Sequence, residues 1–308
     1  NHGTLRSTIP GTDVATAVTR LRDYAAQVGD LRVGDQRDPS VHLELSQVDV
    51  SAILHSAREH DKPGARKVKL RSLLCTAFGH AGQDLTEFVE KVEWRGTSRE
   101  GSVLFGNVRE MDASRFRVPP GHDFRIVIDY PFDEPGHTPQ EDEARIATLA
   151  RDLDERTVVW LPDFLSEALQ ADLGELVVLD AVLAPDALRS YLGDLRAADQ
   201  QQAKQHMESK RSQKHNRVLR ALEAAYGVAT ASDGVVDPSC TVGEHFHLLL
   251  PERRIPALSV NRLADAPTAL AMALLKEAYP RHPEFAERAH KRSLTEAWKV
   301  FARLCERE

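Results

Sequence analysis

The chain has 308 residues, of which 42% are hydrophobic and 28% are charged, and its formal net charge is -7. This composition supports a buried core, and the length predicts two or three compact units. The charge balance is ordinary for a soluble protein and gives no general reason to expect nucleic-acid or membrane binding. Any basic surface is therefore expected to be local.

The three cysteines, Cys75, Cys240 and Cys305, are far apart and form no CxxC pair. A disulfide framework or a thiolate zinc site is not expected, and a reducing compartment fits. No apolar run approaches the roughly 20 residues that span a bilayer, and no signal peptide is visible. We expect a cytoplasmic protein whose natural start lies elsewhere or was removed, because the chain begins with Asn1 instead of methionine.

The first 50 residues predict one helix followed by a hairpin. Apolar residues recur at helical spacing from Val14 to about Val28. Two short strand-like runs follow, around residues 29–34 and 41–45, with a polar loop containing Pro39 between them. A helix and a hairpin form the second half of a winged-helix module, so residues 1–50 are predicted to be a winged-helix-like subdomain. Any other small α+β subdomain would satisfy the same pattern.

A helical connector is predicted over residues 51–100, because the pattern from Asp49 to about Val92 is helical. An α/β core is predicted over residues 101–184. Strand-like runs lie at 102–105, 124–129 and 157–161, with a further candidate at 175–179, and helices are expected between them at 140–153 and 162–173. Unbroken apolar strands separated by helices favour a mainly parallel sheet that is covered on both faces.

A long polar helix is predicted over residues 185–227, with apolar ends and an almost wholly polar middle. Such a helix bridges other units through solvent or forms a hairpin arm. Residues 228–308 are predicted to be a small C-terminal α+β unit with one strand at 246–250 and helices at 266–278 and 293–305. The predicted class is therefore α/β.

A nucleotide site is not predicted in this chain. The phosphate-binding pattern G-x-x-x-x-G-K-[ST] is absent, and the nearest stretch, residues 96–102, lacks the lysine and precedes a strand. The sequence also singles out no nucleophile and no acid/base pair, so no catalytic residue is assigned.

The strand end after residues 124–128 is the candidate metal site. Asp129, Asp133 and Glu134 resemble the acids of a Walker B segment, where a carboxylate holds Mg²⁺. Carboxyl ends of strands are also where α/β sheets bind ligands. Tyr130, Pro131 and Phe132 separate the first acid from the others, however. The alternative is a degenerate or unrelated strand end whose acids cap a turn.

The middle of the long helix carries a local concentration of cations, which is the candidate nucleic-acid site. Between residues 200 and 220, Glu208 is the single acid. The cations are Lys204, Lys210, Arg211, Lys214, Arg217 and Arg220. Lys210, Lys214 and Arg217 share one helix face and could follow a phosphate backbone. A solvated helical arm is the alternative explanation.

Several stretches resemble one bacterial family, the PglY and BrxC-like P-loop ATPases of the phage-growth-limitation (Pgl) and BREX defence systems. The matching stretches are NHGTLRSTIPG at 1–11, AQVGD at 26–30, LSQVDV at 45–50, GNVREM at 106–111, VIDYPFD at 127–133 and YPRHP at 279–283. In that family the ATPase module lies N-terminal to such a region. The resemblance implies that ATP and Mg²⁺ belong to the parent protein only, with no cofactor in this fragment.

The resemblance also implies partners among other proteins of the defence system, which contains a DNA methyltransferase. Our leading hypothesis is a non-catalytic internal region of a defence ATPase that contacts double-stranded DNA or a partner protein. Two alternatives stay open: a metal-dependent hydrolase centred on Asp129, and a purely structural scaffold. No membrane contact is expected.

Overall fold

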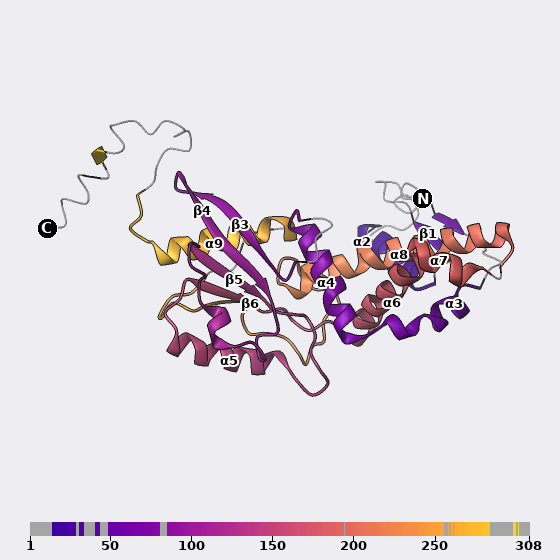
Figure 1. Ribbon diagram of the computed structural model, residues 1–308, viewed down its shortest axis with the longest axis horizontal. Helices are drawn as coiled ribbons and strands as arrows, with labels where there is room; N and C mark the ends of the chain where they lie inside the picture. The colour runs from indigo at the N-terminus through magenta and orange to yellow at the C-terminus, as the bar shows by residue number, and fades with distance from the viewer. Residues whose placement is uncertain are drawn as a thin grey trace. The chain divides into compact units, whose positions relative to one another are not determined.

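A computed structural model describes residues 14–28, 31–33, 41–43, 49–80, 85–193, 195–255, 258, 260, 262–283, 298–299 and 301 (Figure 1). The chain divides into two compact units. We call Asn1–Leu70 with Glu167–Ala221 the first unit, and Arg71–Ser166 with Leu222–Glu308 the second unit. Each unit is built from two separated stretches of sequence, so the division does not follow the five consecutive segments expected from the sequence.

The first unit begins with the predicted helix and hairpin. Helix α2 covers Val14–Val28, and strands β1 (Leu31–Val33) and β2 (Val41–Leu43) pair antiparallel, with Leu31 opposite Leu43. These elements agree with the sequence expectation. The more specific winged-helix assignment stays a prediction.

The rest of the first unit is helical. It contains α3 (Ser51–Ser56), η1 (Arg58–His60), α6 (Glu167–Leu183), α7 (Pro185–Leu192) and most of α8 (Ala197–Ala225). An apolar core joins α3, α6 and α8 through residues such as Leu54, Leu179 and Met207. The division between the units falls inside α4 (Pro63–Ala77) and inside α8.

The second unit is built on a five-stranded mixed sheet with the order β3-β4-β5-β6-β7. The strands are β3 (Glu87–Trp94), β4 (Thr97–Phe105), β5 (Phe124–Ile128), β6 (Thr157–Trp160) and β7 (Phe246–Leu248). The pairs β4–β5 and β5–β6 are parallel, whereas β3–β4 and β6–β7 are antiparallel. The expectation of a mainly parallel sheet is therefore wrong, because the two edge strands, β3 and β7, run antiparallel to their neighbours.

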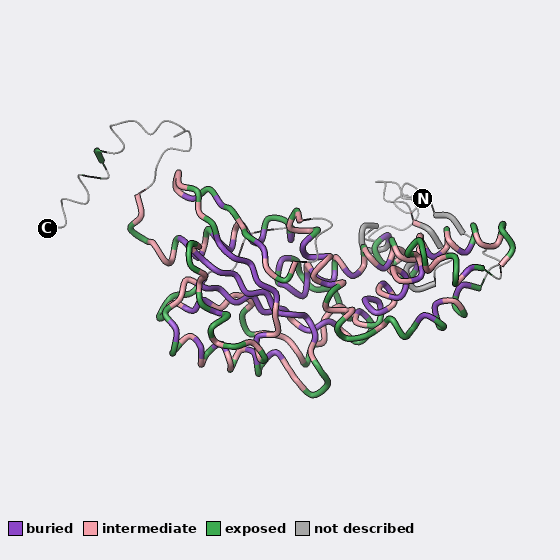
Figure 2. The backbone as a smooth tube through the Cα atoms, viewed as in Figure 1, coloured by how far each residue is buried: buried purple, intermediate pink, exposed green. Residues whose placement is uncertain are grey.

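Both faces of the central strands are covered, as their unbroken burial in Figure 2 shows. Helix α5 (Pro139–Asp152) packs on one face, where Ile146 and Leu149 join Val127 and Val159 in one core. Helix α9 (Ala266–Ala278) packs against β3 and β5. Short 3-10 turns η2 (Ala113–Phe116) and η3 (Leu263–Asp265) complete the described elements. Burial on both sides explains why β5 and β6 are apolar apart from Arg125 and Thr157.

Strand β3 corrects the predicted helical connector, since it occupies the end of the stretch expected to be helical. Its burial alternates, with Phe88, Val92 and Trp94 buried while Val89 and Lys91 are exposed. A two-residue turn at Arg95 and Gly96, both with positive φ (48° and 73°), joins β3 to β4. That conformation matches the right-handed twist of a hairpin.

Two further expectations are wrong. Residues 175–179 are not a strand but the middle of α6, and that helix begins at Glu167 instead of residue 162. A short apolar run fits a buried helix as well as a strand, and α6 is apolar on most sides. The single long helix is two helices, α7 and α8, with a break between Leu192 and Ala197.

The C-terminal segment does not form a unit of its own. Strand β7 pairs with β6 in the central sheet, and α9 has the bounds expected from the sequence. The helix expected at 293–305 lies mostly outside the described residues. Among the described helices, none is both long and apolar enough to cross a membrane.

We expect Gly101→Ala to destabilise the second unit by about 1–3 kcal/mol. A Cβ atom at Gly101 would lie 2.2 Å from the ring of Phe124, which is fully buried on the neighbouring strand. Urea unfolding followed by circular dichroism measures the loss. Gly64→Ala is the matched control, because nothing lies within 4 Å of its added Cβ. Equal stabilities of the two variants would contradict this packing.

Candidate functional site

A network of ion pairs joins α6 to α8 in the first unit. Lys210 lies 2.5 Å from Glu175, and Lys214 lies 2.7 Å from the other oxygen of Glu175. Lys214 also donates to Asp172, and the second oxygen of Asp172 forms an ion pair with Arg217 at 2.6 Å. Three cations from one face of α8 are thus matched by two carboxylates of α6.

The centre of this network is buried. The side chains of Asp172 and Lys214 are each 8% exposed. Burial opposes ionisation of Glu175, but its hydrogen bonds to Lys210 and Lys214 outweigh burial and lower its pKa. Charges with so little access to water persist only when paired, so the network requires all of its members.

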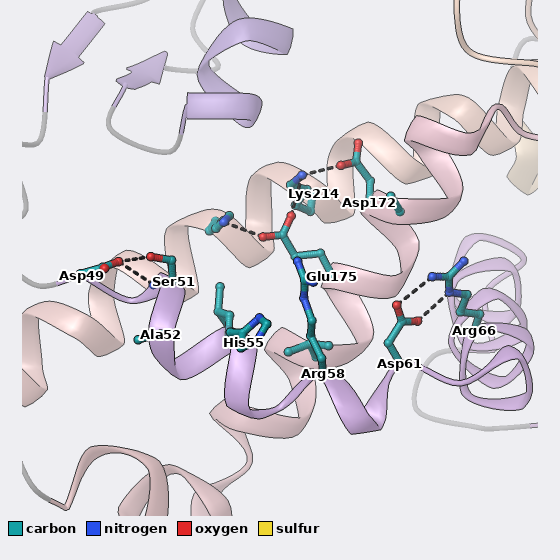
Figure 3. Close-up of a pocket in the computed structure, with 14 residues that line it drawn as sticks. Asp49, Ser51, Ala52, His55, Arg58, Asp61, Arg66, Asp172, Glu175 and Lys214 are labelled. Atoms are coloured by element: carbon teal, nitrogen blue, oxygen red, sulfur yellow. Dashed lines mark hydrogen bonds and ion pairs between the residues drawn. The ribbon is translucent and has the colours of Figure 1, made fainter.

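The network forms one wall of a cleft of about 940 Å³ (Figure 3). The opposite wall comes from α3, η1 and the start of α4. The lining residues are Asp49, Ser51, Ala52, Leu54, His55, Arg58, Asp61, Arg66, Ala171, Asp172, Glu175, Val178, Lys210 and Lys214. Four of them are lysines or arginines and four are carboxylates, so the lining has no excess of either sign.

The wall opposite the network carries its own ion pair. Arg66 donates from Nε and Nη2 to the two oxygens of Asp61, at 2.6 and 2.7 Å. This two-point contact raises the pKa of Arg66. Gly174 on α6 makes the close approach possible, since a Cβ there would lie 2.4 Å from an oxygen of Asp61. Arg58, by contrast, is exposed and has no ion pair within the described part of the chain.

The structure places the predicted nucleic-acid residues in different surroundings. Lys210, Lys214 and Arg217 face α6 and are ion-paired there. Arg211 lies 3.8 Å from Asp180, and Lys204 lies 3.9 Å from Glu208 on its own helix.

Arg220 is exposed, without an ion pair among the described residues. The shared helix face of the three central cations was predicted correctly, but it packs against carboxylates instead of lying in solvent.

Asp172 and Glu175 are functional candidates that the sequence analysis did not identify. Their spacing of three residues is the signal that was available, since it places both on one face of a helix. The signal was missed because the stretch containing Glu175 was assigned to a strand.

At the other candidate site, the carboxyl end of β5 holds buried carboxylates. Asp129 is 4% exposed and accepts from the backbone amides of Tyr130 at 2.7 Å and Val108 at 3.3 Å. Burial raises the pKa of Asp129 well above its usual value, and Asp142 adds to the effect. Asp133 accepts hydrogen bonds from the side chains of Asn107 and Arg109 and from the backbone amide of Glu134. Burial opposes ionisation of Asp133, but these contacts outweigh it and lower the pKa of Asp133.

Asp142, in the first turns of α5, belongs to this cluster although the sequence did not single it out. It is 4% exposed, and in the described part of the chain its Oδ1 atom has no hydrogen-bond partner. Burial and the nearby Asp133 raise the pKa of Asp142 to about 6. The negative charge of Asp142 in turn helps to raise the pKa of Asp129, so the two carboxyl groups influence each other's ionisation.

The predicted metal residues do not converge on one point. Asp129 and Asp133 are each engaged by their own amide and side-chain donors, while Glu134 is exposed. Over the ranges that the structure describes, no group of three or more histidine, cysteine or acidic side chains is arranged to hold a metal ion.

We expect Asp172→Ala to cost about 3–5 kcal/mol of unfolding free energy, because it leaves buried cations without a counter-charge. Chemical denaturation with and without added salt measures this loss, which should be largely insensitive to salt. Glu208→Ala is the control, since it removes a partner of an exposed pair 3.9 Å long and should cost below about 0.5 kcal/mol. A similar cost for both variants would show that the network is not buried in solution.

We expect Asp142→Asn to become increasingly stabilising relative to wild type as pH rises. The folded pKa of Asp142 lies above its unfolded value, so the wild type loses stability as pH rises through about 6. The asparagine cannot ionise, and the difference should grow by about 1–2 kcal/mol between roughly pH 4.5 and pH 7. Unfolding titrations across this range measure it. Asp152→Asn, on the exposed end of the same helix, should show no such growth.

Residues 53–279 match the family model described as the PglY fourth domain. The matched range includes α6 and α8 and the strand end at Asp129. No solved structure matches the chain.

Proposed function

This chain belongs to the PglY family, through residues 53–279, and from this premise we propose that it is a non-catalytic contact domain whose first unit binds a partner protein. The family match confirms the resemblance to the Pgl and BREX phage-defence proteins. A role in a phage-defence protein follows from that membership. The contact role and its partner are the proposal.

The charge balance of the cleft in the first unit carries this proposal. A polyanion is attracted by a local excess of positive charge, which the lining lacks. Using Lys214 or Arg217 to bind phosphate would leave the buried Asp172 beside a second anion. A protein surface, by contrast, can offer groups of both signs to such a lining.

Arg58 is the residue most available to such a partner. It is exposed on η1, lines the cleft, and has no ion pair within the described residues. Arginine is also the charged residue most enriched among the positions that dominate protein–protein binding energy.

Contact with double-stranded DNA is the second candidate, now restricted to a smaller set of residues. Arg220 is exposed, and Lys204 has only a long contact with an exposed acid, so both retain charge for phosphate. The winged-helix-like prediction for residues 1–50 supports the same role.

Metal-dependent hydrolysis at Asp129 is disfavoured by the engagement of its carboxylate with backbone amides. A purely structural scaffold would need neither Arg58 nor Arg220.

In this proposal ATP and Mg²⁺ act in other parts of the parent protein, because the chain has no phosphate-binding loop. The partner is then another protein of the same defence system.

Arg58→Glu in the parent protein tests the protein contact. We expect binding to a purified protein of the same defence system to weaken roughly tenfold or more, because the charge of the cleft is reversed at its accessible cation. Surface plasmon resonance against each purified protein of the system measures the change. Arg196→Glu is the matched control, an exposed arginine of the same unit outside the cleft lining. Unchanged binding by Arg58→Glu to every protein of the system would overturn the proposal.

Titration of duplex DNA at low and moderate salt separates the second candidate. If DNA is the partner of α8, Lys204→Gln with Arg220→Gln should weaken binding and reduce its salt dependence. No binding at low salt would remove the DNA role of α8 and leave the protein contact in place.

A further inference from the structure

At the end of the sheet opposite Asp129, in the second unit, we propose a site for the phosphodiester backbone of a nucleic acid. Arg99 lies near the start of β4, Asp123 directly precedes β5, and Arg156 directly precedes β6. The parallel register pairs Gly101 with Phe124 and Arg125 with Thr157. Arg99, Asp123 and Arg156 therefore lie at the same end of the strands, the amino end of β5 and β6.

Two of the arginines are held by one aromatic ring. The guanidinium carbons of Arg99 and Arg156 each lie 5.7 Å from the ring centroid of Tyr279, which follows α9. Arg156 also donates to the Tyr279 hydroxyl. The ring therefore positions both guanidinium groups without neutralising their charge, because it carries no carboxylate.

A third arginine joins them from the hairpin turn. Arg95 lies over the Trp94 ring at 4.8 Å and donates to the carbonyl of His282 at 2.5 Å. The Nη2 atom of Arg99 lies 3.0 Å from Nε2 of the same histidine. We call Arg95, Arg99 and Arg156 the arginine cluster, together with Arg281, which is exposed and directly precedes His282 in the sequence.

The charge of this cluster differs from that of the cleft in the first unit. Arg99 is ion-paired with Asp123 at 2.9 Å, and both side chains stay 22–28% exposed. Among the described residues, no carboxylate is ion-paired with Arg156 or Arg281. Neutral hydrogen-bond donors would be enough to fix the end of α9 to the sheet. Packing alone therefore does not explain why several arginines lie there.

A phosphodiester backbone fits these features. Guanidinium groups bind phosphate through planar paired donors, and rings that hold them in place reduce the entropy lost on binding. The cluster does not offer a stacking platform for bases, because Trp94 is only 3% exposed and Tyr279 is already flanked by arginines. Binding is therefore expected to be independent of sequence and strongly dependent on salt. This site goes beyond the protein contact proposed above and stands or falls without it, since it uses other residues.

The test measures fluorescence anisotropy of labelled single-stranded and duplex oligonucleotides with the whole chain. We expect the double variant Arg156→Gln/Arg281→Gln to weaken binding roughly tenfold or more near 50 mM salt. The double variant loses two phosphate contacts. The slope of log affinity against log salt should therefore become shallower by about 1.4 for a single strand. Arg151→Gln, an exposed arginine on α5, is the matched control and should bind like wild type.

Two further arms keep the result interpretable. Arg281→Gln alone changes an exposed side chain and should reduce binding even if the double variant unfolds. Arg156→Lys keeps the charge and should retain most of the salt slope. Absence of binding by wild type at low salt, equal binding by the double variant, or equal competition by polyglutamate would each overturn the proposal.

Discussion

Pairing of buried charge between α6 and α8 is the constraint on which the first unit depends. Asp172 and Lys214 are almost fully removed from water, and each is stable there only because the other is present. Glu175 and Arg217 complete the arrangement and fix the register of the two helices. A helix whose middle is almost wholly polar thereby packs one face against α6, with Lys210, Lys214 and Arg217 directed at carboxylates and unavailable to a large anion.

The sheet of the second unit has contrasting ends. At the carboxyl ends of β4 and β5, Asp129 and Asp142 are buried together, and their surroundings favour a neutral carboxyl group. At the amino ends, arginines gather around Tyr279. Parallel strands bring residues from separate loops to the same end of the sheet, so each end gathers side chains that are distant in sequence. The two ends therefore have different capacities: one responds to protons, and the other attracts anions.

Prediction from the sequence succeeded where a local pattern had one physical solution. The alternating and unbroken apolar runs that became β4, β5 and β6 were found, as was α9 with its bounds. It failed where the same pattern fits two structures. The run containing Glu175 is apolar enough for a strand or for a buried helix, and β3 alternates within a stretch that was assigned to a helix. Local periodicity cannot choose between such solutions, because the burial that separates them comes from distant residues.

The sequence by itself determined the family, the α/β class, the missing phosphate-binding loop and the helix face shared by Lys210 and Lys214. Only the tertiary structure decided what that face meets. The carboxylates of α6 precede it by more than 30 residues, and a charge stripe looks the same in sequence whether water, DNA or a neighbouring helix neutralises it. The role of a charged side chain is set by its counter-charge and its access to water, and both are properties of the folded chain.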